Sequence, residues 1–199
     1  MSSKRWSAAP YLPGSHSLYS PDGRRKYLNQ SERRAFLDAA ASEDQPTHTL
    51  CLTLAYTGCR ISEALSLTRS SVQPGVNVIA IRTLKKRGRV MVREIPVPDE
   101  LVRLLLHDQE NGHSDTPLWP FGRTFAWRQV KSVMTRAGID GPYASPRGLR
   151  HGFAVSAVLA GVPLTLIQKW LGHANLTTTA IYADATGPEE REMARRMWT

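Results

Sequence analysis

Cysteine is scarce in this sequence, and the cysteines present have neither the number nor the spacing of a metal site or a disulfide framework. Cys51 and Cys59 are the only two among 199 residues, and no Cys-x-x-Cys pair occurs. Both stand among apolar residues, so we expect reduced thiols inside a core. The sequence therefore predicts a protein without a bound metal, and no pattern in it indicates a cofactor.

Long hydrophobic runs and acidic residues are also few. No apolar stretch approaches a membrane span, and the N-terminus lacks the apolar region of a signal peptide, so we expect a cytoplasmic protein with no membrane partner. The 17 acidic residues stand against 26 Lys and Arg, which gives a formal net charge of +9. This surplus favours a polyanionic partner, and nucleic acid fits it best.

The residues that are present divide the chain into an arm and one domain. Residues 1–26 are rich in Ser, Pro, Gly and Tyr and carry basic residues at both ends, which predicts a basic, weakly ordered N-terminal arm. Residues 27–199 show helical periodicity and one pair of alternating segments, 76–82 and 90–97. We therefore expect a single, mainly α domain with a small antiparallel β-sheet, an α+β fold.

The turn between the two alternating segments is the most basic part of the chain. Residues 86–89 are predicted to form the tip of a hairpin. A hairpin with this charge is suited to contact phosphates along a nucleic-acid backbone, because no acidic residue offsets it before Glu94. The basic residues of this patch are Arg82, Lys85, Lys86, Arg87, Arg89 and Arg93.

Residues 57–65, TGCRISEAL, predict a sharp turn followed by a helix. Gly58 permits the turn, and Arg60 falls in the first turn of the helix. There its guanidinium can bind a phosphate together with the helix N-terminus. Taken alone, a surface arginine paired with Glu63 is the simpler interpretation.

Residues 145–184 contain several polar side chains at the ends of three predicted helices. Ser145 suits an N-cap and Pro146 the first helical position, so the first helix is predicted to begin there. Arg147, Arg150 and His151 then share one face of its first two turns, near the positive end of the helix dipole. This face suits an anion.

The second and third of these helices are shorter. The second is predicted over residues 163–172 and leaves His173 on the connection just beyond it. In the third, Leu176 and Ala180 form the apolar stripe. Regular α-helical rotation then points Tyr182 well away from this stripe, so we expect its side chain to lie off the core.

Two more helices carry a possible binding face. Residues 187–199 predict a short C-terminal helix with an apolar stripe that docks on a protein surface. The helix over 125–137 is predicted to have one packed and one basic face. Its inward residues are Trp127, Val130, Val133 and Met134. The outward basic residues are Arg128, Lys131 and Arg136, together with Arg123 just before the helix.

Taken together and in this order, the motifs resemble the catalytic domain of the tyrosine recombinases, also called phage integrases. They are TGCRISE at 57–63, the basic hairpin, GLRH at 148–151, LGH at 171–173, and Tyr182 nine residues after His173. The resemblance covers roughly residues 29–184 and implies the DNA breaking-rejoining fold. We expect no counterpart here of the family's usual N-terminal core-binding domain. In that respect the chain is similar to the short recombinases that invert fimbrial promoters and to small plasmid-borne resolvases.

The resemblance implies a site-specific recombinase (integrase, resolvase or invertase) that cuts and rejoins DNA strands through a covalent 3′-phosphotyrosine, without a metal. It implies Tyr182 as the nucleophile, Arg60 and Arg150 as a clamp on the phosphate, and His173 as a hydrogen-bond donor to it. For the lysine that protonates the leaving 5′-oxygen we choose Lys85, with Lys86 as the alternative. Further DNA contacts are expected from Lys86, Arg87, Arg89, Arg93, Arg128 and Lys131.

The implied partner is double-stranded DNA. The resemblance also implies a homotetramer on two DNA sites, formed from monomers or dimers off DNA, with accessory DNA-bending proteins at the bacterial nucleoid or on a plasmid. In such a tetramer the segment 187–199 packs on a neighbouring protomer, and docking on its own core is the alternative.

One position departs from the family pattern. Arg147 stands where the family usually has a histidine that acts as general base toward the tyrosine. Arginine cannot accept a proton at neutral pH, although it can lower the pKa of the tyrosine or bind the phosphate. His151 is a substitute for the base, or a residue that only packs against the site.

Other functions stay open. Because of Arg147, one is a DNA-binding regulator on the same scaffold with weak or lost catalysis. Another is a monomeric type IB topoisomerase, which shares the active-site chemistry but relaxes supercoils without site preference. A phosphate-ester enzyme acting on small molecules fits least, because it leaves the basic surface without a role.

The basic hairpin gives a first testable prediction. Replacing Arg87 and Arg89 by Gln should weaken binding to every DNA sequence and flatten the dependence of log K on log salt by about 0.9 for each lost phosphate contact. Fluorescence anisotropy with a random duplex at several salt concentrations measures this slope. Arg103→Gln, outside the hairpin, is the control, and an equal slope in all three proteins would show that the hairpin tip does not touch the backbone.

Overall fold

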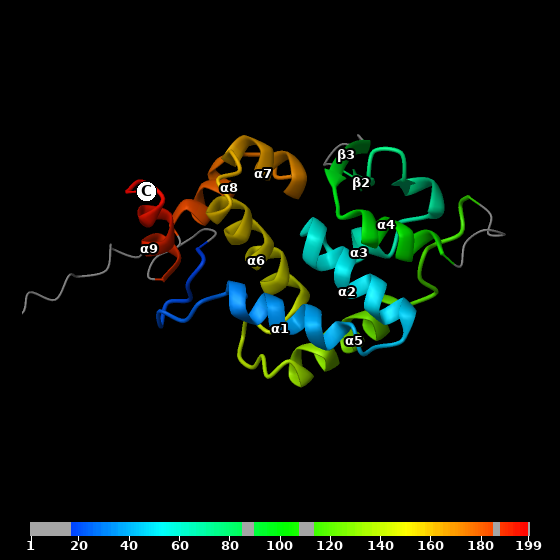
Figure 1. The fold of residues 1–199 in the computed structure, drawn as a ribbon, viewed down its shortest axis with the longest axis horizontal. Coiled ribbons are helices and arrows are strands. Elements are labelled where there is room, and N and C mark those ends of the chain that lie inside the picture. Colours follow the sequence, from blue (N-terminus) through cyan, green and yellow to red (C-terminus); the bar gives the residue numbers. More distant parts are fainter. Residues whose placement is uncertain (1–16, 85–89, 108–113, 185–187, 199) are drawn as a thin grey trace, which may run out of the picture.

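The computed structural model describes residues 17–84, 90–107, 114–184 and 188–198. These residues form a mainly helical domain with one small sheet, as the sequence predicted (Figure 1). No helix in these ranges is long and apolar enough to span a bilayer. The helices are α1 (Gln30–Ala40), α2 (Gln45–Thr57), α3 (Ile61–Ala64), α4 (Asp99–Leu106), α5 (Arg123–Arg136), α6 (Pro146–Leu159), α7 (Leu164–Leu171), α8 (Thr177–Ala180) and α9 (Pro188–Arg195), with 3₁₀ turns η1 (Arg69–Ser71) and η2 (Ile181–Asp184).

The sheet is antiparallel in the order β1 (Val72–Gln73), β2 (Val78–Leu84), β3 (Val90–Pro96). The β2–β3 hairpin is therefore confirmed, and the short β1 is an edge that the sequence did not reveal. Ile79 pairs with Ile95, and both are almost fully buried. Residues 85–89 lie outside the described residues, so the roles expected of Lys85, Lys86, Arg87 and Arg89 stay predictions.

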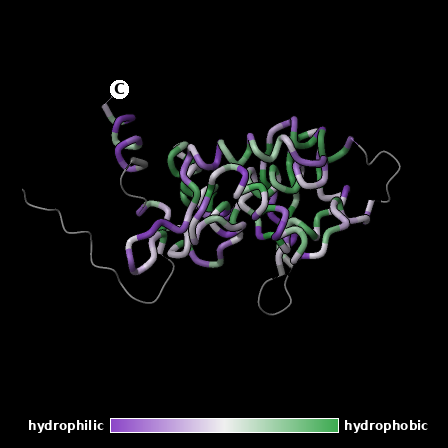
Figure 2. The backbone as a smooth tube through the Cα atoms, turned by 90° about the horizontal axis from the view of Figure 1, so that it is seen from below, coloured by the Kyte–Doolittle hydropathy of each residue, from purple (hydrophilic) through white to green (hydrophobic). Residues whose placement is uncertain are grey.

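The core consists of two apolar clusters joined by α6, which crosses the molecule beside α2 and ends near α7 and α8 (Figure 1). Leu149, near the start of α6, belongs to the larger cluster with α1, α2, α4, α5 and the sheet. The later residues of α6 form the smaller cluster with α7. Figure 2 shows hydrophobic segments running through this body, while the polar α9 lies at one end. Cys51 and Cys59 are free and buried, as expected, and burial raises the pKa of these thiols to about 12 and about 11.

The N-terminal segment is folded from Ser17 onward, so the expected boundary of the arm at residue 26 is too late. Leu18 and Tyr27 are only 2% and 1% exposed and lie in the smaller cluster. Between them, Arg25 donates two hydrogen bonds of 2.7 Å to the carboxylate of Glu32. Composition predicted a weakly ordered arm because it weighed the charge and the Ser, Pro and Gly content of the segment. The segment also carries Leu18 and Tyr27, and burial of these apolar side chains holds it on the domain. Residues 1–16 lie outside the described residues.

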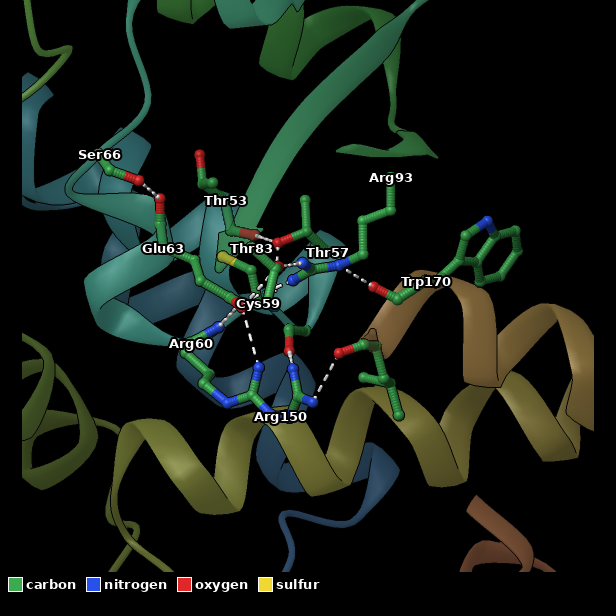
Figure 3. A network of polar contacts seen from close by, with 12 residues as sticks. Thr53, Thr57, Cys59, Arg60, Glu63, Ser66, Thr83, Arg93, Arg150 and Trp170 are labelled. Atoms are coloured by element: carbon green, nitrogen blue, oxygen red, sulfur yellow. Dashed lines mark hydrogen bonds and ion pairs between the residues drawn. The ribbon is translucent and has the colours of Figure 1, made fainter. Parts of the chain in front are cut away.

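Arg93 is buried, and the expectation that it belongs to the exposed basic patch is wrong. Its side chain is only 4% exposed, and it contacts both Glu63 and Thr83 (Figure 3). Strand alternation is the cause, because Arg93 pairs with Ile81 and shares the inward face with Ile95.

This buried guanidinium ties β3 to two helices. Nη2 of Arg93 lies 2.6 Å from Oε2 of Glu63 in α3, and its Nε donates to the carbonyl oxygen of Trp170 in α7 over 2.6 Å. The hydroxyl of Thr83 on β2 adds a 3.0 Å hydrogen bond to Oε1 of Glu63. The hairpin is thus held by charged and polar contacts as well as by its apolar face.

Helix α5 differs from its prediction at Trp127, which is 44% exposed rather than inward. Ala126 takes the buried position instead, four residues before Val130. Of the two α5 residues expected at DNA, Arg128 is exposed, whereas Lys131 is partly buried and donates from Nζ to the carbonyl oxygen of Ala144 over 2.7 Å. Arg136 pairs with Glu43.

Gly148 provides a test of how closely α6 packs. A Cβ at this position would overlap the carbonyl oxygen of Tyr143, so Gly148→Ala should lower the free energy of unfolding by about 3 kcal/mol, although alanine normally favours a helix. Urea denaturation followed by circular dichroism measures the change. Gly75→Ala, which would meet no atom within 4 Å, is the control. A neutral effect of Gly148→Ala would contradict the close approach.

The Arg93–Glu63 pair gives a second test. Arg93→Met leaves the carboxylate of Glu63 buried without its main partner and should cost about 3–5 kcal/mol of unfolding free energy. The matched control is Arg103→Met, which breaks the exposed pair with Asp99 and should change the stability by less than about 1 kcal/mol. Equal denaturation midpoints for the two variants would show that the buried pair does not hold the hairpin.

Candidate active site

Arg150 lies at the centre of the site, where α6 passes the ends of two other helices. Ser145 caps α6 by accepting a 3.1 Å hydrogen bond from the Gly148 N–H, and Pro146 occupies the first position, as predicted. Arg150 is the fifth residue of α6, so the cap fixes its place early in the second turn. Its guanidinium is buried and donates from Nη1 to the carbonyl oxygen of Gly58 (2.7 Å) and from Nη2 to that of Leu171 (2.8 Å).

Both carbonyl oxygens lie where a helix ends in the left-handed conformation. Gly58 follows α2 with φ of 59°, and Gly172 follows α7 with φ of 68°. The carbonyls there have no partner within their own helix, so they are open to Arg150. Burial, and to a smaller extent the charge of Arg60, lowers the pKa of Arg150 to about 10, so the side chain remains a cation at neutral pH.

Arg60 is the N-cap residue of α3, and its side chain is about half exposed. Its Nη1 donates to Oε1 of Glu63 over 2.9 Å, and its backbone N–H donates to Oε2 over 2.8 Å. The pairing with Glu63, which the sequence offered as the simpler interpretation, is therefore present, and Arg60 also lies beside Arg150 (Figure 3). Phosphate binding by Arg60 stays a prediction.

Glu63 is the member of the site that the sequence analysis undervalued. Burial alone would raise the pKa of its carboxyl, but hydrogen bonds from Arg93 and from the backbone of Arg60 outweigh burial and hold that pKa below its usual range. Glu63 is therefore a carboxylate shared by two arginines. Its position three residues after Arg60 gave the only sequence signal.

Tyr182 is buried, with 1% of its surface exposed, so the expectation that it points off the core is wrong. The helix α8 is only four residues long and continues as the 3₁₀ turn η2. In a 3₁₀ turn, side chains three residues apart align, and Thr179 and Tyr182 both face inward. Leu176, expected to be buried, is 44% exposed instead.

Two histidines contact the buried tyrosine. The hydroxyl of Tyr182 lies 3.0 Å from Nδ1 of His151, and the ring of His173 stacks on the Tyr182 ring with centroids 6.2 Å apart. Nδ1 of His173 lies 2.9 Å from the hydroxyl of Thr179. Arg147 is exposed and directs its Nε toward Nε2 of His151 over 3.4 Å.

The electrostatic field at Tyr182 combines opposing effects. Burial raises the pKa of its phenol above the ordinary value, whereas the positive charges of Arg150, Arg147 and Arg60 act to lower it. The structure thus brings five of the six predicted catalytic residues together, Tyr182 and the four whose side chains lie near it. The sixth, Lys85, lies outside the described residues.

The chemistry open to this arrangement is nucleophilic attack on a phosphate. Guanidinium groups bind phosphate oxygens and stabilise negative charge that develops on them, and a phenolate can attack phosphorus. Among the described residues, no three His, Cys, Asp or Glu side chains gather in a way that could hold a metal ion.

Comparison with known proteins agrees with this chemistry. Residues 26–188 match the family model described as the phage integrase family. The tyrosine recombinase XerD of Corynebacterium glutamicum is 31% identical over 173 residues, which cover 79% of this chain and 54% of the relative. The chain thus spans about half the length of that curated relative.

Solved structures extend the likeness to the fold. The crystal structure of XerA recombinase superposes with a TM-score of 0.74 at 27% identity and covers 96% of this chain and 67% of that one. XerH recombinase bound to its difH substrate, in a pre-cleavage complex, gives a TM-score of 0.69 at 21% identity over 91% of this chain and 60% of that one. Because the family model spans the whole region that carries Arg60, Arg150, His173 and Tyr182, the chain belongs to the phage integrase family, that of the tyrosine recombinases.

Proposed function

We propose that this protein is a site-specific DNA recombinase that cleaves and rejoins DNA strands through a covalent 3′-phosphotyrosine intermediate. The observation that carries the proposal is the convergence of Tyr182, His173, Arg150 and Arg60 on one place, with the tyrosine hydroxyl among the cations. Family membership and the likeness to XerD support it. A regulator without catalysis is not favoured, because DNA binding alone does not require a phenol surrounded by the positive charges of three arginines.

The roles follow from the chemistry of phosphoryl transfer. Tyr182 attacks the phosphorus, and the bond to the 5′-oxygen breaks on the opposite side. Arg60 and Arg150 hold the non-bridging oxygens, and His173 donates a hydrogen bond to one of them. Lys85 protonates the leaving 5′-oxygen. Because Tyr182 is buried in the structure, DNA binding has to open the η2 turn far enough for the scissile phosphate to reach the hydroxyl.

The partner is double-stranded DNA. The positive charge of the chain and the DNA complex of XerH support this choice. Contacts along the backbone come from the hairpin tip and from the exposed face of α5, which carries Arg128. We place the activity on chromosomal or plasmid DNA in the bacterial cytoplasm, with accessory DNA-bending proteins.

The working assembly is a homotetramer on two DNA sites, which forms from monomers or dimers. Helix α9 and the residues that follow it support this part of the proposal. Met193, Met197 and Trp198 are 40%, 82% and 78% exposed, so their apolar side chains gain from packing on a neighbouring protomer.

The nucleophile is tested with Tyr182→Phe. This variant should form no covalent protein–DNA adduct, because it lacks the attacking oxygen, while its DNA affinity should change by less than about fivefold, since a lost neutral hydrogen bond contributes about 1 kcal/mol or less. The substrate is a library of nicked duplexes with randomised arms, and adducts that resist denaturant are captured and sequenced.

Tyr56→Phe, a change of the same size on α2, is the matched control and should keep the adduct. An adduct in Tyr182→Phe would place the nucleophile elsewhere. The absence of an adduct in the unchanged protein, at DNA concentrations that saturate binding, would favour the DNA-binding regulator instead.

A further inference from the structure

His151 contacts the reactive atom of the site but has no part in the mechanism above. Its Nδ1 lies 3.0 Å from the hydroxyl oxygen of Tyr182, and the two rings lie 5.8 Å apart at 48°. The ring comes from α6, one residue after Arg150, on a rigid element that the cap at Ser145 fixes. A contact of this length to the attacking oxygen affects the ease with which the phenol loses its proton.

Arg147 determines which ring nitrogen of His151 carries the hydrogen. Its Nε lies 3.4 Å from Nε2 of His151, and an arginine nitrogen can donate a hydrogen bond but cannot accept one. Nε2 must therefore present its lone pair to Arg147. A neutral imidazole with a lone pair on Nε2 has its hydrogen on Nδ1, and this N–H then points at the oxygen of Tyr182.

We propose that His151 is a further catalytic residue of this recombinase, which donates its Nδ1–H to the Tyr182 oxygen and stabilises the attacking phenolate, and that Arg147 is the positioning residue that fixes this tautomer. The proposal rests on the recombinase function proposed above. A general base at His151 would need its lone pair on Nδ1 and a hydrogen on Nε2. The N–H of Arg147 and the N–H of His151 would then point at each other, and no hydrogen bond could form between two donors.

The surroundings of the phenol show why a donor matters. Burial opposes ionisation of Tyr182, and three guanidiniums favour it, those of Arg150 and Arg147 on α6 and of Arg60 before α3. A further titratable group, His173, which follows α7, stacks on the ring. A hydrogen bond aimed at the oxygen itself adds to the guanidinium charges and partly offsets the effect of burial.

The proton balance of the step is then complete. The phenol of Tyr182 releases its proton to water, and the phenolate oxygen keeps the hydrogen bond from His151 until it bonds to phosphorus. As that bond forms, the bond from phosphorus to the 5′-oxygen breaks. The 5′-oxygen takes its proton from the proposed general acid, Lys85, so His151 neither gains nor loses a proton during the reaction.

The decisive comparison is between His151→Asn and His151→Phe. In asparagine, Nδ2 is bonded to Cγ as Nδ1 is in histidine, so it keeps a donor near the Tyr182 oxygen but cannot act as a base. Phenylalanine keeps the ring and removes the donor. A donor role predicts that the asparagine variant loses much less activity than the phenylalanine variant, and a base role predicts that both variants lose activity equally.

The first measurement needs no DNA. With 3,5-difluorotyrosine in place of Tyr182 in the full chain, ¹⁹F NMR follows ionisation of this phenol alone. His151→Phe should raise its pKa by about one unit or more, the loss of a hydrogen bond to a charged oxygen, while His151→Asn should leave it within about half a unit. Arg147→Gln should also raise it. A phenol pKa that is the same in the His151→Phe variant and the unchanged protein would overturn the hydrogen bond.

The second measurement is the rate of adduct formation on the nicked-duplex substrate. At neutral pH His151→Phe should slow cleavage about tenfold or more, and difluorotyrosine at position 182 should restore much of the rate, because its phenol ionises more readily. His151→Asn should keep a clearly larger share of the unchanged rate than His151→Phe. Equal losses in His151→Asn and His151→Phe would overturn the donor role in favour of a base. If no protein forms an adduct while the ¹⁹F shifts stand, the recombinase function fails, and the catalytic role of His151 fails with it, whereas the hydrogen bond remains.

Discussion

One buried carboxylate holds the site together. Glu63 accepts hydrogen bonds from Arg60, Arg93 and Thr83, and through Arg93 it also fixes the end of α7. A buried charge without a partner is costly, so each of these contacts restrains the element that provides it. The sheet, α3 and α7 are consequently positioned relative to one another by a single acidic group.

The same carboxylate sets the charge balance of the site. One negative group cannot neutralise Arg60, Arg93 and the nearby Arg150, so an excess of positive charge remains beside Tyr182. This excess is available to an anion, and in the function proposed above that anion is the phosphate of a DNA backbone. The carbonyl oxygens that hold Arg150 orient its guanidinium without consuming its charge, and a group held in this way needs little reorganisation when negative charge develops on a bound phosphate.

Local sequence signals predicted the parts of the structure that local rules decide. The cap at Ser145, the turn at Gly58 and the alternating strands of the hairpin were all found where expected, because each depends on a few neighbouring residues. The approach of Arg60, Arg150 and Tyr182, far apart in the chain, could be expected only from the resemblance to a family.

The errors have equally physical causes. Arg93 was grouped with its charged neighbours, although the alternation of β3 already turned it inward with Ile95. Tyr182 was placed by regular α-helical rotation, which the short α8 and the 3₁₀ turn do not follow. The sequence could have settled the first case, but the second required the tertiary fold, since the change of helix type depends on packing against the core.

The apolar cluster around Tyr182 also includes Leu18 and Tyr27 from the start of the described chain. If Tyr182 leaves this cluster, the core loses a buried side chain. It also loses buried side chains if the N-terminal segment detaches, so the two events are thermodynamically linked. Any force or ligand that peels residues 17–28 from the domain therefore loosens the tyrosine as well. The segment that carries Leu18 and Tyr27 and the nucleophile thus share one small core, so the stability of either depends on the other.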